Sequence, residues 1–258
     1  MPLTASDAIV LKTHALGDTS RIVVVYSRDR GLLKFVAKGA RKTPSRFGYA
    51  LEPLTHARYH FYYKPDRDLH LLSQADVIAA TGSRLTDLER LAHAGAAIEL
   101  IDRLVWGEEP HEELFDVLAA TLLSIADAPV PALPAITIAF ELQAASLLGY
   151  RPRFDACASC SGTLSRERLF SPARGGLMCD RCAAEGGVIA LSADALAGLS
   201  LLLTRPVGEA GDYFEVKRSG EILRVVEAFL RHHFQRFQGL RSLELLRSIS
   251  VERPGRVA

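Results

Sequence analysis

Signatures of common catalytic sites are missing from the 258-residue sequence. It has no G-x-x-x-x-G-K-[ST] phosphate-binding loop and no G-x-G-x-x-G run that opens a helix after a strand. The stretch that begins His111-Glu112-Glu113 lacks the second histidine of a zinc protease, and no H-x-E motif precedes the cysteines as in a zinc deaminase. No cluster of Asp and Glu indicates a two-metal nuclease. We therefore expect a protein that is not an enzyme; an active site whose residues converge only in space is the alternative.

Targeting and membrane segments are also missing. The N-terminus carries Asp7 and no basic run followed by an apolar one, so we expect no signal peptide. The longest apolar stretches are short or are interrupted by charge, as at Glu141, so we expect no membrane span. Only four cysteines are present, in two close pairs, which favours a metal in a reducing cytoplasm over a secreted disulfide framework.

The chain has almost no excess of positive over negative charge, since its formal net charge is only +1. The charged residues are nevertheless unevenly distributed along it. Residues 1–80 contain 12 Lys and Arg against 7 Asp and Glu, a balance of +5. Residues 81–258 contain 19 against 23, a balance of −4. Only the first third is therefore expected to bind a polyanion.

The hydrophobic pattern changes period near residue 80, which predicts an α+β protein. Five segments rich in β-branched and aromatic residues are expected to be strands, at 8–11, 22–26, 32–37, 57–63 and 69–72. They predict a small closed barrel, either an OB-fold or an SH3-like barrel. Helices are expected at 83–105, with Thr86 and Glu89 as a capping box, and at 112–126, 136–148, 192–204, 220–237 and 242–248. The predicted domains are the barrel at 1–80 and a helical domain at 81–258, with residues 155–185 inserted in it.

A run of cations follows the third predicted strand. Seven basic residues and one acid lie between Arg28 and Arg46. Gly39 ends the strand, and Pro44 and Gly48 exclude an ordinary helix after it, so we expect a flexible loop at the rim of the barrel. Such a loop neutralises phosphates and releases their counterions; a solvated surface loop is the alternative. The candidate nucleic-acid-binding residues here are Lys34, Lys38, Arg41, Lys42 and Arg46.

The fourth predicted strand adds three candidates. Tyr59, Phe61 and Tyr63 alternate along one face and are expected to pack inside the barrel. The other face carries Arg58, His60, Tyr62 and Lys64. Cations on either side of an aromatic ring suit single-stranded nucleic acid, because bases stack on the ring while the backbone meets the charges. Arg58, Tyr62 and Lys64 are therefore candidates, and a solvated strand face is the alternative.

The four cysteines have the spacing C-x2-C-x18-C-x2-C, formed by Cys157, Cys160, Cys179 and Cys182. Each pair places two sulfurs on one side of a tight turn, and two such turns complete a tetrahedron around Zn²⁺. Four thiolates leave no open position for water, so we expect one structural zinc ion per chain. Disulfides, a redox-active dithiol or simple packing are the alternatives.

A second basic stretch, from Arg231 to Arg241, closes the long helix near the C-terminus. Cations at that end stabilise the helix dipole, and an auxiliary nucleic-acid surface is the alternative.

The chain resembles the RecO family of bacterial recombination mediators. The resemblance rests on the run Lys38-Gly39-Ala40-Arg41-Lys42, followed by Ser45-Arg46-Phe47 and Leu51-Glu52-Pro53-Leu54, and it continues through the helical region and the cysteine pairs. It implies an OB-fold, and it implies that the protein binds single- and double-stranded DNA, anneals complementary strands and works in DNA repair at the nucleoid. It also implies RecR, the C-terminal tail of single-strand-binding protein and, indirectly, RecA as partners. A zinc-containing RNA-binding or transcription-associated module is the alternative function.

Overall fold

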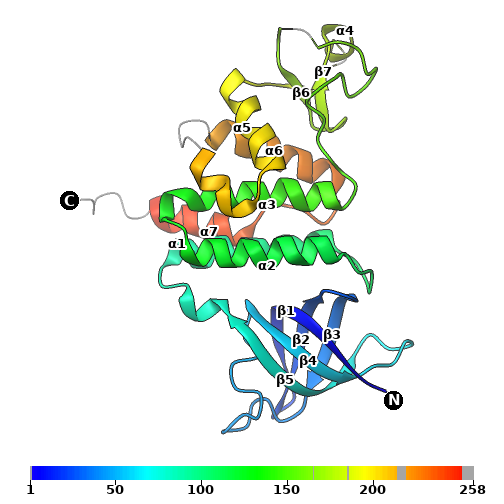
Figure 1. The fold of residues 1–258 in the computed structure, drawn as a ribbon, viewed down its shortest axis with the longest axis vertical. Coiled ribbons are helices and arrows are strands. Elements are labelled where there is room, and N and C mark those ends of the chain that lie inside the picture. Colours follow the sequence, from blue (N-terminus) through cyan, green and yellow to red (C-terminus); the bar gives the residue numbers. More distant parts are fainter. Residues whose placement is uncertain (1, 165, 185, 214–218, 252–258) are drawn as a thin grey trace, which may run out of the picture. The chain divides into compact units, whose positions relative to one another are not determined.

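Five strands close the N-terminal barrel, as drawn at the blue end of Figure 1: β1 (Leu3–Leu16), β2 (Ser20–Ser27), β3 (Gly31–Ala37), β4 (Thr55–Tyr62) and β5 (His70–Ala80). Their order is β1-β2-β3-β5-β4, and β4 pairs back onto β1. The β3–β5 pair is parallel and the other four pairs are antiparallel. This is the five-stranded Greek-key closure of an OB-fold. The predicted strands are confirmed, although β1 is much longer than the expected 8–11.

The computed structural model describes residues 2–164, 166–184, 186–213 and 219–251. Contacts divide the chain into two compact units, residues 1–126 and residues 127–258. The predicted domain boundary between residues 80 and 81 stays a prediction.

The barrel core confirms the predicted strand faces. Leu33, Phe35 and Ala37 of β3 are buried together with Tyr59 and Phe61 of β4. The three aromatic rings stack closely, with centroid distances of 5.6 Å from Phe35 to Tyr59 and 4.8 Å from Phe35 to Phe61. Because side chains alternate along a strand, burying these residues turns Lys34 and Arg58 outward.

The loop from residue 38 to residue 54 contains no helix, as Pro44 and Gly48 predict. It is nevertheless held firmly, because Phe47 and Leu51 are buried in the barrel core. The hydroxyl of Tyr59 donates a hydrogen bond of 2.6 Å to the carbonyl of Ala50. Buried apolar side chains therefore anchor the segment that carries the cations, and the flexibility of the exposed part stays a prediction.

The first unit also contains a 3-10 turn (η1, Thr81–Arg84) and two helices, α1 (Leu88–Leu104) and α2 (Glu112–Asp127). The predicted capping box is wrong, because Asp87 caps α1 by accepting a hydrogen bond of 2.7 Å from the backbone N–H of Arg90. Between the two helices, the carbonyl of Gly107 accepts a 2.9 Å bond from Leu32 of β3. The ring centroids of Phe115 in α2 and Tyr26 in β2 are 6.1 Å apart, so α2 covers part of the outer face of β2.

The second unit is built around α3 (Leu133–Leu147), which follows the short turn η2 (Val130–Ala132). The helices α5 (Ala193–Thr204) and α6 (Ser219–His233) and the turn η3 (Val207–Tyr213) pack on α3, and α7 (Arg241–Val251) ends the described chain (Figure 1). Helices from both sides of the cysteine segment therefore meet, as predicted. The segment Val130–Leu147 is apolar and long enough to cross a membrane, but 61% of it is buried, as in the core helix of a folded domain.

The inserted segment leaves α3 through a predicted glycine cap. Gly149 has φ of +91°, and the Tyr150 N–H donates to the carbonyl of Ala145 in the pattern of a Schellman motif. The segment then forms three short strands, β6 (Leu169–Ser171), β7 (Gly176–Met178) and β8 (Ile189–Ala190), and one turn of helix, α4 (Asp180–Ala183). The sheet order is β7-β6-β8.

Candidate nucleic-acid interface and metal site

Three lysines at and just after the end of β3 are exposed to solvent. Lys34 and Lys38 alternate with the half-buried Val36 on the outer face, and Lys42 stands on the following loop. Within the described part of the chain, none of the three lysine side chains makes a hydrogen bond or an ion pair. Their charges are therefore available to an anion from outside the protein.

Two arginines of the loop are oriented by backbone carbonyls. The guanidinium of Arg41 donates a 2.7 Å bond to the carbonyl of Gly17, in the turn between β1 and β2. Arg46 lies 4.5 Å above the ring of Phe47 and makes a long 3.4 Å bond to the carbonyl of Leu72 in β5. A carbonyl fixes the direction of a guanidinium without cancelling its charge. Both arginines are exposed.

The candidates on β4 and just after it have different surroundings. Arg58 is placed opposite Asp7 of β1 and Asp76 of β5, and its guanidinium approaches the Asp7 carboxylate at 3.4 Å. Its charge is thus partly balanced within the protein, so we rank it below the lysines. Lys64 lies in the β4–β5 loop, where its backbone N–H donates to Nδ1 of the buried His70. The Lys64 side chain is half-buried and makes no hydrogen bond or ion pair in the described residues.

Tyr62 belongs to an apolar band that the sequence did not reveal. Strand pairing aligns Ile22 of β2 with Val36 of β3, Val36 with Leu71 of β5, and Leu71 with Tyr62 of β4. All four side chains are partly exposed on the outer face of the barrel. Only the order in which strands pair places these four residues in one row across the sheet, so periodicity along one strand gives no signal for the band. Lys34 in β3 and Lys38, the residue after its end, lie on either side of Val36 along the chain.

The combination of an apolar band with flanking cations suits a single strand of nucleic acid. Bases have apolar faces that stack on aromatic and aliphatic side chains, and the phosphates need positive charge alongside. The face formed by β2 and β3, with the β1–β2 and β4–β5 loops, is also where OB-folds bind oligonucleotides. We call the four-residue band and its cations the barrel surface; the cations are Lys34, Lys38, Arg41, Lys42, Arg46 and Lys64.

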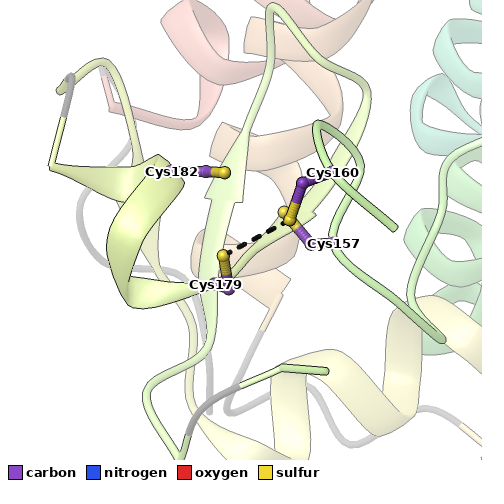
Figure 2. A group of neighbouring side chains, drawn as sticks. All are labelled: Cys157, Cys160, Cys179 and Cys182. Atoms are coloured by element: carbon purple, nitrogen blue, oxygen red, sulfur yellow. Dashed lines mark hydrogen bonds between the residues drawn. The ribbon is translucent and has the colours of Figure 1, made fainter. Parts of the chain in front are cut away.

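The four cysteines converge as their spacing predicts. The sulfurs of Cys157, Cys160, Cys179 and Cys182 all lie within 4.8 Å of one another, and Figure 2 shows them pointing toward a common centre. The Sγ atoms of Cys160 and Cys179 are 3.7 Å apart. Zinc–sulfur bonds of about 2.3 Å in a tetrahedron place sulfurs about 3.8 Å apart. The donor set therefore fits a structural metal ion.

Local structure explains this convergence. The first pair lies on a turn in which the Ser161 N–H donates to the carbonyl of Cys157. In the second pair, Cys179 is the N-cap of α4 and Cys182 lies within this single turn of helix. The Ala158 N–H donates a 2.8 Å bond to Leu177 of β7, so one backbone bond fixes the first turn beside the second.

The electrostatics of the cluster favour a bound cation. Backbone N–H groups of Cys160 and Cys179 lower the pKa of the Cys157 thiol to about 6. The neighbouring sulfurs of Cys179 and Cys160 raise the pKa of Cys182 to about 11. Four thiolates at these distances repel one another, and a divalent ion at their centre removes that repulsion. A small apolar cluster of Cys157, Met178 and Ala183 supports the site.

The basic stretch near the C-terminus is engaged with its own unit. Arg231 donates a 2.7 Å bond to the Glu227 carboxylate one turn earlier. His233 lies 3.0 Å from the carbonyl of Pro172, and burial lowers its pKa. The helix α6 ends at His233, so the charge of Arg231 lies where it stabilises the helix dipole.

Comparison with known proteins gives matches along almost the whole chain. Residues 1–81 match the family model described as "Recombination protein O N terminal", and residues 85–244 match "Recombination protein O C terminal". A protein of Streptomyces griseus, named DNA repair protein RecO, is 36% identical over 250 residues, which cover 94% of this chain and 98% of the relative. A protein of the same name from an Anaeromyxobacter species is 36% identical over 244 residues, covering 88% and 90%. One from Pelotomaculum thermopropionicum is 32% identical over 238 residues, covering 92% and 91%.

Proposed function

The chain belongs to the RecO family of DNA repair proteins, and from this membership we propose that it is a recombination mediator. In this proposal it binds single- and double-stranded DNA and anneals complementary strands without bond-making chemistry. With RecR it helps to load RecA onto DNA that is coated by single-strand-binding protein. The observation that carries the proposal is the barrel surface, where lysines that make no hydrogen bond or ion pair within the described residues flank an apolar band.

The proposed mechanism is electrostatic. Two complementary strands repel each other through their phosphates, and each bound Lys or Arg neutralises part of that charge and releases a counterion. Lys34, Lys38 and Lys42 are assigned to the phosphates, and Arg41 and Arg46 are aimed by their carbonyl contacts. Bases that stack along Val36, Leu71 and Tyr62 keep their pairing edges free for a second strand. Base pairing itself then provides the free energy of annealing.

We propose that the four cysteines hold one Zn²⁺ ion with a structural role. When bound, the ion cross-links the two cysteine turns and supplies folding free energy to the inserted segment. The apolar cluster around Met178 is small, so the segment depends on this cross-link for its stability. The proposed location is the cytoplasm, at the nucleoid, where such a site stays reduced.

Docking of the acidic C-terminal tail of single-strand-binding protein on the helical part of the chain is also proposed from the family. An apolar groove with a nearby arginine is the chemistry that such a tail needs.

The test combines salt-dependent binding with strand annealing. Binding of single-stranded DNA is expected to fall with salt by about 0.7 log units per log of salt for each phosphate contact. Replacing Lys38, Arg41 and Lys42 together by Ala is expected to reduce this slope by about 2 and to slow annealing of strands precoated with single-strand-binding protein. The metal content and far-UV circular dichroism of the variant are expected to match the wild type.

A matched control removes the same formal charge elsewhere, by replacing Arg28, Arg224 and Arg231 with Ala. All three arginines lie outside the barrel surface, and Arg28 and Arg231 already pair with carboxylates of their own unit, so the salt slope is expected to stay unchanged. An unchanged slope in the Lys38/Arg41/Lys42 variant would exclude the barrel surface. Matched DNA and RNA oligonucleotides in the same assay separate DNA repair from RNA binding, and turnover of labelled DNA with added divalent metal would reveal an enzyme.

A further inference from the structure

The zinc-binding segment and its flanks are rich in arginine, although the chain around them is acidic. Residues 151–182 contain six arginines, no lysine and three acids, a balance of +3. Over residues 81–258 as a whole the balance is −4. A guanidinium presents a planar fork of donors that matches the oxygens of a phosphate better than an ammonium does. The local composition is therefore that of an anion-binding surface.

Two open hollows in this region meet at one aromatic ring. The first, about 650 Å³, is lined by Arg151 and Arg153, and the second, about 510 Å³, is lined by Arg166 and Arg168. Phe154 lines both hollows. We call these five residues and the two hollows the arginine groove.

Phe154 is held in place by the core beneath it. Its ring lies 6.1 Å from the ring of Phe170, which is only 1% exposed. The ring of Phe170 is in turn 6.4 Å from Phe229 of α6. Phe154 itself is half-buried, so it combines a supported side with an accessible one. A ring fixed in this way stacks on a base with little loss of side-chain entropy.

The four arginines divide into two anchored and two free side chains. Arg151 donates to the hydroxyl of Ser146 at 3.2 Å, and Arg153 lies 3.3 Å from the Asp155 carboxylate. Arg166 and Arg168 are exposed and make no side-chain hydrogen bond or ion pair in the described residues. Asp155 and Glu167 also line the hollows, so each hollow keeps an excess of one positive charge.

We propose that the arginine groove binds single-stranded DNA as a second site, distinct from the barrel surface. This inference rests on the proposed function, and it gives one chain a separate place for each of two strands before they pair. The aromatic ring shared by the two hollows favours a single strand of DNA, because a base can stack on the ring while the phosphates on either side meet the arginines.

The test replaces the two free cations, Arg166 and Arg168, together by Ala and measures binding of labelled oligo(dT) over a range of salt concentrations. The salt slope is expected to fall by about 1.4, from two lost phosphate contacts. The control variant, Arg174→Ala with Arg224→Ala, removes the same charge from exposed positions outside both hollows and is expected to leave the slope unchanged. Phe154→Leu keeps packing on Phe170 and is expected to weaken binding about tenfold at fixed salt. Zinc content checks that each variant keeps its fold.

The outcomes separate this inference from the proposed function. If wild-type protein binds DNA and only the Lys38/Arg41/Lys42 variant changes the slope, the groove inference is wrong and the proposed function stands. If wild-type protein binds no DNA, the proposed function itself fails. The Arg166/Arg168 variant could instead keep the wild-type salt dependence of DNA binding and lose binding of a labelled poly-aspartate peptide. That result would assign the groove to an acidic partner and overturn the inference.

Discussion

Replacing the buried Glu141 by Gln is expected to reduce the loss of folding stability that the second unit undergoes as the pH rises. Glu141 lies on α3, is 5% exposed, and makes no hydrogen bond or ion pair in the described residues. Burial, with a smaller contribution from Glu227, raises the pKa of Glu141 from 4.5 to about 8, and Arg247 offsets part of this effect. At neutral pH the folded protein therefore keeps a proton that the unfolded chain has released.

The sign follows from proton binding in the two states. A carboxyl whose pKa is raised on folding binds its proton more tightly in the folded state, so it favours folding at low pH. That advantage is lost as the pH rises from 4.5 to about 8. At about 1.4 kcal/mol per pH unit, the loss between pH 5 and 8 is about 3.5 kcal/mol at most. It is an upper bound because the adjoining cavity of about 30 Å³ has room for water, which would stabilise the carboxylate.

Urea unfolding followed by circular dichroism between pH 5 and 8 measures this contribution. Gln has the same shape and cannot ionise, and its amide can donate to the Glu227 and Glu244 carboxylates that line the cavity. The free energy of unfolding of Glu141→Gln is therefore expected to decline less with pH than that of the wild type, by up to about 3.5 kcal/mol. Glu113→Gln, on the exposed start of α2, is the control and should follow the wild type. Parallel pH profiles for wild type and Glu141→Gln would refute a buried, protonated carboxyl.

Two further predictions concern structure elsewhere in the chain. Gly31→Ala is expected to destabilise the first unit by at least about 2 kcal/mol, because φ is +67° and a Cβ would collide with the backbone of Glu109. Gly17→Ala has the same strain with open space around it, so thermal unfolding should show a loss of only about 1 kcal/mol; equal losses would rule out the Glu109 contact. Cys179→Ser is expected to lose the metal and to unfold the inserted segment, whereas Thr163→Ala in the same segment should keep one zinc per chain by elemental analysis. Full stability of Cys179→Ser without metal would refute a structural role.

Features set by neighbouring residues were predictable from the sequence. The alternation from Leu33 to Lys38 fixes which side chains enter the barrel, because successive residues on a strand face opposite ways. The C-x2-C spacing alone brings each pair of sulfurs together on a turn. Ser192 caps α5, accepting a bond from the backbone N–H of Ala195, and the Gly149 cap is equally local. Such features depend on chain geometry over a few residues.

Features that depend on distant residues were decided only by the tertiary structure. The apolar band exists because β5 inserts between β3 and β4, which sets Leu71 between Val36 and Tyr62. The cross-strand carboxylates that partly balance Arg58 come from other strands, and the two hollows of the arginine groove meet only where the chain folds around Phe154. The loop after β3 is held because Phe47 and Leu51 reach the core, although its Gly and Pro content favours a mobile segment. The periodicity of a strand predicts on which face of the sheet a side chain lies. The residues that the side chain contacts there depend on strand order and on packing, which only the tertiary structure determines.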